Sequence, residues 1–195
     1  MKKIILASKS PRRKQLLESI KLKFEVVVSD FNESLIKEKD PRKLVEEISK
    51  QKAKTVAGKY KDAMIIAADT TVVLDKKIIG KPTSIDNARE ILQKLSGRGH
   101  KVITGFTILD AKTKKSVTKS VASRVYFKKL TKKEIEAYIK TGEPMDKAGA
   151  YGVQDKAGAF IEKIEGDFFN VVGLPIFSVC KTLLEFGINI TSHWK

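Results

Sequence analysis

The sequence of 195 residues contains few of the residues on which several functional classes depend. Its single cysteine, Cys180, cannot form an internal disulfide, and one cysteine also excludes a Cys/His zinc site. There are two histidines, His100 and His193, and no Gly-x-Ser-x-Gly segment, which together disfavour a serine hydrolase. With 12 glycines and 5 prolines, the composition also excludes collagen-like and low-complexity chains.

Long apolar runs are absent as well. No segment approaches the roughly 18 apolar residues that a membrane-spanning helix needs. The start of the chain resembles a signal peptide only superficially, because the apolar stretch that begins at Ile4 ends at Ser8. We therefore expect a soluble cytoplasmic protein. Cys180 lies among apolar residues, which favours a small buried hydrophobe over a catalytic thiol.

Positive charge is abundant. Lysine and arginine total 39 against 23 aspartates and glutamates, so the net charge is +16. Such a field favours an anionic partner, whereas the alternative is a general preference for lysine on solvated surfaces. The basic residues are spread along the whole chain, and one tryptophan and four tyrosines leave no interleaving of aromatic and basic residues. A nucleic-acid-binding module is therefore the disfavoured rival.

Strand and helix signals alternate along the chain. Its length predicts one domain over residues 1–195, with two lobes. Ser10, Asp40, Ser84 and the Thr131-x-x-Glu134 capping box each predict the start of a helix, and a last helix precedes Gly187. Apolar segments predict strands at 4–7, 24–28, 64–68, 72–74, 78–79, 102–109, 117–127, 160–164 and 171–172. The expected fold class is α/β, with a mixed central sheet flanked by helices.

The first candidate site lies where the first strand passes into the first helix, at Ala7–Arg13. Helix N-termini present unpaired N–H groups, and Ser8 and Ser10 add hydroxyls. Arg12 and Arg13 add two permanent cations whose forked geometry suits phosphate oxygens. The segment lacks the glycines of a Walker loop. It is either a phosphate site or a solvated basic first turn.

Asp69 is the second candidate. It follows the apolar run Met64–Ala68, which predicts that the strand stops there and places the carboxylate at a strand end, where ligands gather in α/β sheets. A carboxylate at this place can hold a divalent cation or accept a proton from water, or it can simply cap the next turn. Glu33 lies in a polar loop and is a weaker candidate to act together with Asp69.

Three further side chains are ambiguous from the residues alone. Lys81 lies between Gly80 and Pro82 just past an expected hairpin, which favours a special role over that of an ordinary lysine. Lys52 is on a helix and can equally lie over the adjacent apolar stripe. Gln154, in a glycine-flanked loop, offers the paired donor and acceptor that read a base edge, or it is polar surface.

Taken together, these segments resemble the Maf family of nucleotide pyrophosphatases. The matching pieces run in order over nearly the whole chain. They are Leu6–Arg13, Gln51–Ala53, Ala68–Val73, Gly80–Pro82, Leu95–His100 with Thr104-Gly105, and the stretch from Gly142 to Pro175. The resemblance implies a Maf/ITPase-like fold and hydrolysis of nucleoside triphosphates to monophosphate and pyrophosphate. It also implies a divalent cation, Mg²⁺ or Mn²⁺, and a homodimer.

The resemblance also implies roles for individual residues. Asp69 matches the catalytic proton acceptor, and Glu33 with Asp69 matches the metal-binding carboxylates. Residues that match polar positions around the phosphates are Ser8, Arg12, Arg13, Lys52 and Lys81. Positions at which branches of the family differ match Arg12, Thr70 and Gln154.

Thr70 resembles the branch that acts on dTTP and UTP, whereas the branch acting on 7-methyl-GTP typically has Gln at this position. Asn32 departs from the family pattern, in which an acidic residue often precedes the glutamate. The expected reaction is attack of water on the α-phosphorus with release of intact pyrophosphate. A pyrophosphatase with another base preference, such as 7-methyl-GTP, is the alternative enzyme.

Overall fold

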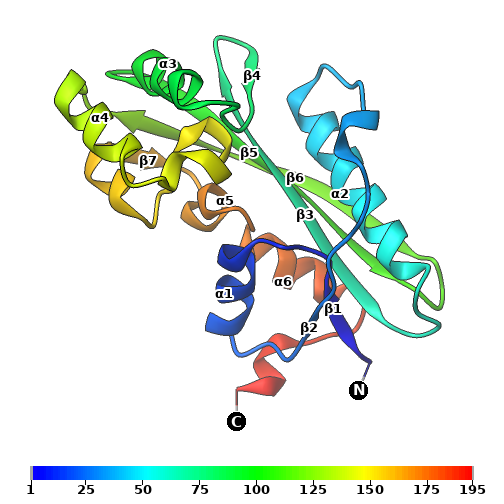
Figure 1. The fold of residues 1–195 in the computed structure, drawn as a ribbon. Coiled ribbons are helices and arrows are strands. Elements are labelled where there is room, and N and C mark those ends of the chain that lie inside the picture. Colours follow the sequence, from blue (N-terminus) through cyan, green and yellow to red (C-terminus); the bar gives the residue numbers. More distant parts are fainter. Residues whose placement is uncertain (1, 195) are drawn as a thin grey trace. The chain divides into compact units, whose positions relative to one another are not determined.

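The structure, a computed structural model, describes residues 2–194, and its elements are labelled in Figure 1. The strands are β1 (Ile4–Leu6), β2 (Glu25–Val26), β3 (Met64–Leu74), β4 (Lys77–Ile79), β5 (Gly99–Asp110), β6 (Ser116–Phe127) and β7 (Ile161–Glu165). The α-helices are α1 (Pro11–Ser19), α2 (Pro41–Ala57), α3 (Ile85–Leu95), α4 (Lys132–Ile139), α5 (Phe168–Val172) and α6 (Ile176–Leu184). None of these helices is both long enough and apolar enough to cross a membrane.

The strands form one mixed sheet in the order β2-β1-β3-β5-β6-β7, and β4 pairs with β3. Both β2 and β3 run parallel to β1, whereas β4 is antiparallel to β3 and β7 is antiparallel to β6. With helices flanking this sheet, the expected α/β fold with a mixed sheet is confirmed.

The chain packs as two compact units. Unit 1 contains residues 2–69, 104–121 and 173–194, and unit 2 contains residues 70–103 and 122–172. Strands β3, β5 and β6 each contribute residues to both units. That residues 1–195 form a single domain stays a prediction.

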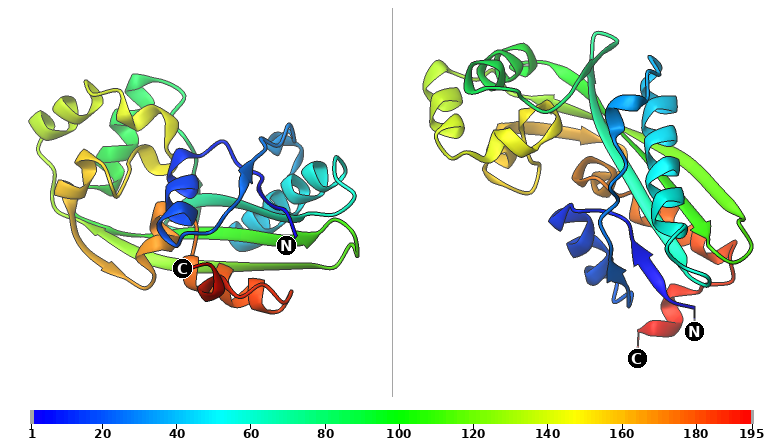
Figure 2. Two further views of the ribbon diagram at one scale, coloured as in Figure 1. Left: turned by 90° about the horizontal axis from the view of Figure 1, so that it is seen from below. Right: turned by 45° about the vertical axis from the view of Figure 1, so that its right-hand side comes forward.

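Unit 1 is organised by the packing of α2 on its strands, which both views in Figure 2 show. Ala53 and Val56 of α2 are fully buried in one apolar cluster with Ile5 of β1 and Ile65 of β3, which are paired in the sheet. The helix lies so close to β5 that a Cβ on Gly105 would be 2.5 Å from the carbonyl carbon of Val45. Glycine at this position therefore lets α2 approach the sheet.

Unit 2 has its own apolar core, in which α3 and α4 lie side by side (Figure 1). The capping box of Thr131 and Glu134 starts α4, as the sequence predicts. His100 is buried in this core, and its Nε2 lies 2.7 Å from the hydroxyl of Tyr151. Burial lowers the pKa of His100 to about 4, so the imidazole is neutral near pH 7.

Two predictions from the apolar pattern need correction. The expected strand at 171–172 is wrong, because these residues end α5. The cause is local: Oδ1 of Asp167 accepts hydrogen bonds from the backbone N–H groups of Phe169 (2.8 Å) and Asn170 (3.2 Å) and so starts a helix. Cys180 is only half-buried, although that burial raises the pKa of its thiol.

Candidate functional site

The segment between β1 and α1 is folded around two serine hydroxyls. Ser8 is buried, and its Oγ accepts hydrogen bonds from the backbone N–H of Ser10 (3.2 Å) and from Nη1 of Arg13 (3.3 Å). Ser10 caps α1 by accepting from the backbone N–H of Arg13, and Pro11 occupies the first helical position. The predicted strand-to-helix turn is therefore confirmed, and Arg12 and Arg13 lie in the first turn of the helix.

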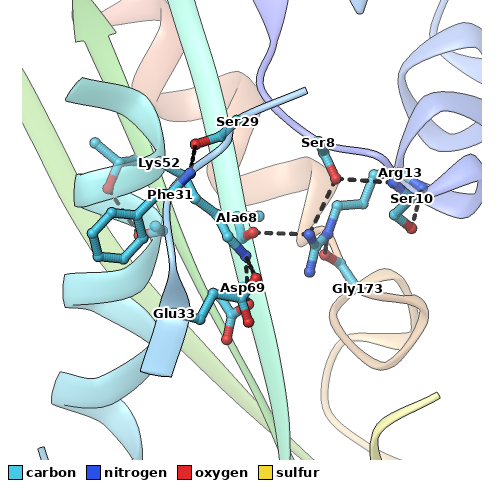
Figure 3. A network of polar contacts seen from close by, with 12 residues as sticks. Ser8, Ser10, Arg13, Ser29, Phe31, Glu33, Lys52, Ala68, Asp69 and Gly173 are labelled. Carbon is cyan, nitrogen blue, oxygen red and sulfur yellow. Dashed lines mark hydrogen bonds and ion pairs between the residues drawn. The ribbon is translucent and has the colours of Figure 1, made fainter. Parts of the chain in front are cut away.

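The guanidinium of Arg13 connects three segments of unit 1, as Figure 3 shows. Its Nε donates to the carbonyl of Gly173 at 2.8 Å, and its Nη1 donates to the carbonyl of Ala68 at 2.8 Å. Burial lowers the pKa of Arg13, while the negative charges of Asp69 and Glu33 oppose that shift. Because Ala68 directly precedes Asp69, Arg13 fixes the backbone beside the candidate catalytic carboxylate.

Lys52 brings together two carboxylates from separate elements. Its Nζ lies 2.8 Å from Oδ1 of Asp69 and 2.7 Å from Oε1 of Glu33. The side chains of Lys52 and Asp69 are 12% and 16% exposed, whereas that of Glu33 is 53% exposed. An ammonium group thus lies between a shielded and an accessible carboxylate, and Figure 3 shows Glu33 next to Asp69.

The local sequence explains how these three side chains reach one place. Asp40 caps α2 through the N–H groups of Arg42 and Lys43, and the buried face of the helix directs Lys52 towards β3. Glu33 lies in a short 3₁₀ turn, Glu33–Leu35, which the side chain of Asn32 caps. Asn32 therefore serves the backbone of the turn that carries Glu33.

The position of Asp69 corrects the expectation drawn from the apolar run. Asp69 is not at the end of a strand, because β3 continues to Leu74. Asp69 and Thr70 are both half-buried polar residues within β3, and the residues from Thr71 to Leu74 are again buried. Three polar residues, Asp69 to Thr71, interrupt the apolar run without ending the strand.

Within unit 1, the structure gathers several of the predicted site residues in one cluster. The contacts of Arg13 and Lys52 join the following residues in unit 1: Ser8, Arg13, Glu33, Lys52 and Asp69. Arg12 is partly exposed on the same turn of α1. Thr70, Lys81 and Gln154 belong to unit 2, in which Lys81 and Gln154 are exposed on loops.

Sequence reasoning missed three contributors. The carbonyl groups of Ala68 and Gly173 hold Arg13, and backbone acceptors leave no mark in a sequence. In unit 2, Lys147 is buried and its Nζ lies 2.8 Å from Oδ1 of Asp146. The sequence does contain a signal for Lys147. In Asp146-Lys-Ala-Gly-Ala150, this lysine lies between an aspartate and small residues.

The carboxylates suit a hard cation. Among the described residues, no group of three or more histidine, cysteine or acidic side chains is placed to hold a metal ion. Mg²⁺ usually takes only one or two protein carboxylates and fills its other positions with water and substrate phosphates. Glu33 and Asp69 supply that oxygen donor set, and the ammonium of Lys52 already lies between them as a cation.

Fold and site define an α/β protein with a half-buried carboxylate on a strand, surrounded by cationic side chains. A family model described as "Maf-like protein" matches residues 3–186, and the chain belongs to this family. It is 50% identical over 192 residues to a dTTP/UTP pyrophosphatase of Alkaliphilus metalliredigens (strain QYMF), covering 97% of this chain and 100% of the relative.

Two further relatives carry the same name. A dTTP/UTP pyrophosphatase of Alkaliphilus oremlandii (strain OhILAs) is 47% identical, covering 97% of this chain and 100% of the relative. Another, of Bacillus cereus (strain G9842), is 44% identical, with 98% and 99% covered. The resemblance to Maf proteins that the sequence motifs indicate is therefore confirmed.

Proposed function

We propose that this chain hydrolyses dTTP and UTP to the nucleoside monophosphate and pyrophosphate. Full-length relatives at 44–50% identity bear the name of this activity. The observation that carries the proposal is the ammonium of Lys52 held between Glu33 and Asp69, beside a strand that Arg13 fixes. This cluster combines a candidate proton acceptor with the positive charge that a triphosphate requires.

In the proposed reaction, Asp69 accepts a proton from a water molecule whose oxygen forms a bond to the α-phosphorus. The bond from the α-phosphorus to the oxygen bridging to the β-phosphorus breaks, and its electron pair leaves with pyrophosphate. Charge develops on the phosphoryl oxygens, and fixed cations stabilise it best in a shielded site. The residues proposed to supply hydrogen bonds and charge to the phosphates are Ser8, Arg12, Arg13, Lys52 and Lys81.

We propose Glu33 and Asp69 as the protein ligands of Mg²⁺ or Mn²⁺. Oxygen donors suit both ions, which discriminate only modestly between such sites. When bound, the ion neutralises phosphate charge and polarises the phosphoryl group. The exposure of Glu33 (53%) suits a ligand that must meet an arriving metal–nucleotide complex, and Asp69 at 16% suits a proton acceptor shielded from bulk water.

Base choice is assigned to Arg12, Thr70 and Gln154. The amide of Gln154 offers a donor and an acceptor, which match the N3–H and O4 groups that thymine and uracil present. A substrate with another base, such as 7-methyl-GTP, would keep the reaction and change only these contacts. We also propose a cytoplasmic location, where nucleoside triphosphates are used, and a homodimer.

Pyrophosphate release from dTTP, UTP, CTP, GTP, ATP and 7-methyl-GTP with Mg²⁺ or Mn²⁺ tests the proposal, using wild type and Asp69→Asn. We expect release from dTTP and UTP, with a loss of about 10²- to 10⁴-fold in the variant, because general-base catalysis typically contributes that much. Asp75→Asn is the matched control, since Asp75 is exposed after the same strand and pairs with Arg98.

Three outcomes would contradict parts of the proposal. Release from 7-methyl-GTP alone would overturn the base assignment and keep the reaction. Nucleoside diphosphate and orthophosphate as products would place the attack at the wrong phosphorus. If no nucleotide is hydrolysed with either metal, the enzyme assignment fails, and salt-dependent nucleic-acid binding becomes the next measurement.

A further inference from the structure

Unit 2 contains a buried lysine to which the proposed reaction gives no role. The side chain of Lys147 is only 8% exposed, although lysine is almost never buried without partners. Its Nζ donates to the carbonyl of Glu143 at 2.8 Å and to Oδ1 of Asp146 at 2.8 Å, and Oδ2 of Asp155 lies 3.5 Å away. The ammonium thus connects Glu143, at the start of the loop, to Asp155, which lies eight residues after Lys147.

The turn that Lys147 reaches carries Gln154. The backbone N–H of Asp155 donates to the carbonyl of Gly152 at 3.2 Å, which closes a turn with Val153 and Gln154 at its tip. A Cβ on Gly152 would lie 2.4 Å from Oδ2 of Asp155 and 2.7 Å from Cε of Lys147. The turn therefore packs directly on the stem of the lysine, with no space for a larger residue.

The same segment also holds the loop of Lys81. The backbone N–H of Gly149 donates to the carbonyl of Gly80 at 3.0 Å. Gly149 has a φ of +72°, and a Cβ there would lie 2.8 Å from Cγ2 of Val72, so only glycine fits. Lys147 thus contacts Asp155, which is next to Gln154, and Gly149 contacts Gly80, which is next to Lys81. Gln154 and Lys81 are the two exposed candidate residues of unit 2.

We propose that Lys147 is a positioning residue for base selection: its ammonium holds the Gly152–Asp155 turn so that Gln154 meets the pyrimidine edge in a fixed place. This inference rests on the proposed function. Rotation of an amide exchanges its donor and acceptor, so Gln154 selects uracil over cytosine only while its side chain keeps one orientation, and this requires a backbone that stays in place. A buried charge bonded on several sides supplies that rigidity better than apolar packing of one side chain.

The replacement Lys147→Met tests this inference, because methionine keeps the stem and removes the charge. Asp146 and Asp155 are 64% and 37% exposed, so water can solvate both carboxylates in the variant. We expect KM for UTP to rise about tenfold with kcat changed less than about twofold, as for the loss of a contact that the ground state and the transition state share equally. The preference for UTP over CTP, as a ratio of kcat/KM, should fall about fivefold or more.

Two companion variants separate positioning from folding. Lys156→Met is the matched control, because Lys156 is an exposed lysine in the same loop, paired with Glu143. It should leave the UTP to CTP ratio unchanged. Asp155→Asn keeps the size of the carboxylate and weakens one partner of Lys147, so it should shift the ratio in the same direction by about threefold. It also replaces Lys147→Met if that variant does not fold.

Amide hydrogen exchange supplies a readout that needs no substrate. In Lys147→Met, exchange should become faster in residues 152–158 and stay unchanged in α3 and β6. Unchanged exchange in 152–158, or a UTP to CTP ratio within twofold of wild type in both Lys147→Met and Asp155→Asn, would overturn the inference. Faster exchange throughout unit 2 would also overturn it, because Lys147 would then only stabilise the fold. A wild type that hydrolyses no nucleotide refutes the proposed function instead, and the exchange data still decide whether Lys147 holds the turn.

Discussion

Lys52 in unit 1 and Lys147 in unit 2 are both shielded ammonium groups with two carboxylate neighbours, yet they are built in opposite ways. Lys52 is on a helix, and Glu33 and Asp69 come from a distant turn and a strand, with Asp69 17 residues away. Lys147 finds its carboxylates within its own loop, one of them the preceding residue. The first cluster exists only when unit 1 has folded, whereas the second is a local brace. In our proposals, the long-range cluster takes part in the chemistry and the local one holds the Gly152–Asp155 turn in place.

The largest effect is expected when the charge of Lys52 is removed. We expect Lys52→Met to lower kcat/KM for dTTP about 10²- to 10³-fold, as the loss of one fixed charge-stabilising group typically does. The control is Lys50→Met on the same helix, since Lys50 is 41% exposed and 4.0 Å from Glu47. Pyrophosphate release is the measurement. A loss under about fivefold would show that Lys52 does not stabilise the charge that develops in the reaction.

Glu33→Gln should have a smaller effect. The amide keeps an acceptor for Lys52 but removes one of the two proposed metal-binding carboxylates, so activity should fall roughly 10- to 100-fold. The Mg²⁺ concentration for half-maximal rate should rise as well, because a neutral amide binds the ion less tightly. Glu25→Gln is the control of similar exposure, 59% against 53%. Loss of activity with an unchanged Mg²⁺ dependence would remove Glu33 from the proposed metal site.

Acidic pH should weaken unit 2 through His100. Its pKa is lowered to about 4 by burial, against 6.5 for a free histidine. Between these values the unfolded chain binds a proton that the native chain does not, so stability falls as pH decreases from 7 towards 4. From pH 7 to pH 5, we expect this histidine to cost about 1–2 kcal/mol of unfolding free energy. Urea unfolding of wild type and His100→Gln tests this, since the variant should show a shallower pH slope. Equal slopes would refute it.

A further carboxylate contributes stability in unit 1 in a lower pH range. Burial alone would raise the pKa of Asp110, but hydrogen bonds from Lys2 and from the backbone of Lys112 and Thr113 outweigh it and lower the pKa to about 2. Its contribution is therefore present above about pH 4, the unfolded value, and is lost as pH falls through about 2.

Asp110→Asn should lower the unfolding free energy by about 1 kcal/mol at pH 7, since the amide keeps only part of the hydrogen bonding. Thermal unfolding at pH 7 and at pH 2 measures this, and the difference between variant and wild type should be much smaller at the lower pH. Asp62→Asn is the matched control, because Asp62 also lies near Lys2, at 3.1 Å, but is 56% exposed. An effect of Asp62→Asn as large as that of Asp110→Asn would contradict the assignment of this stability to the hydrogen bonds of Asp110.

The helix starts could be predicted from sequence because their causes lie within a few residues. Ser10, Asp40, Ser84 and Thr131 each accept the backbone hydrogen bonds that a cap requires. The helix that ends at Val172 follows the same rule through Asp167, whereas the apolar pair Val171–Val172 by itself predicts a strand. Local hydrogen bonding overrides β propensity at this place.

The candidate site likewise has parts that the sequence predicts and parts that it does not. The sequence pattern identifies Ser8, Arg13, Lys52 and Asp69 as candidates, because their residue types suit phosphate chemistry. It does not show that Arg13 donates to the carbonyls of Ala68 and Gly173, since those partners are defined by packing. Nor does it show that β3 continues past Asp69, because sheet pairing stabilises the polar residues within the strand.

The division of the chain between the two units also has a consequence for biosynthesis. Unit 2 ends at residue 172, whereas unit 1 needs residues 173–194. During translation, all residues of unit 2 are therefore synthesised before unit 1 is complete, although unit 2 begins later in the sequence. The hydrogen bond from Arg13 to Gly173 can form only after that segment has been translated. Asp69, the proposed proton acceptor, thus gains these surroundings only after Gly173 has been translated, and a chain stalled before Gly173 would lack the hydrogen bond from Arg13.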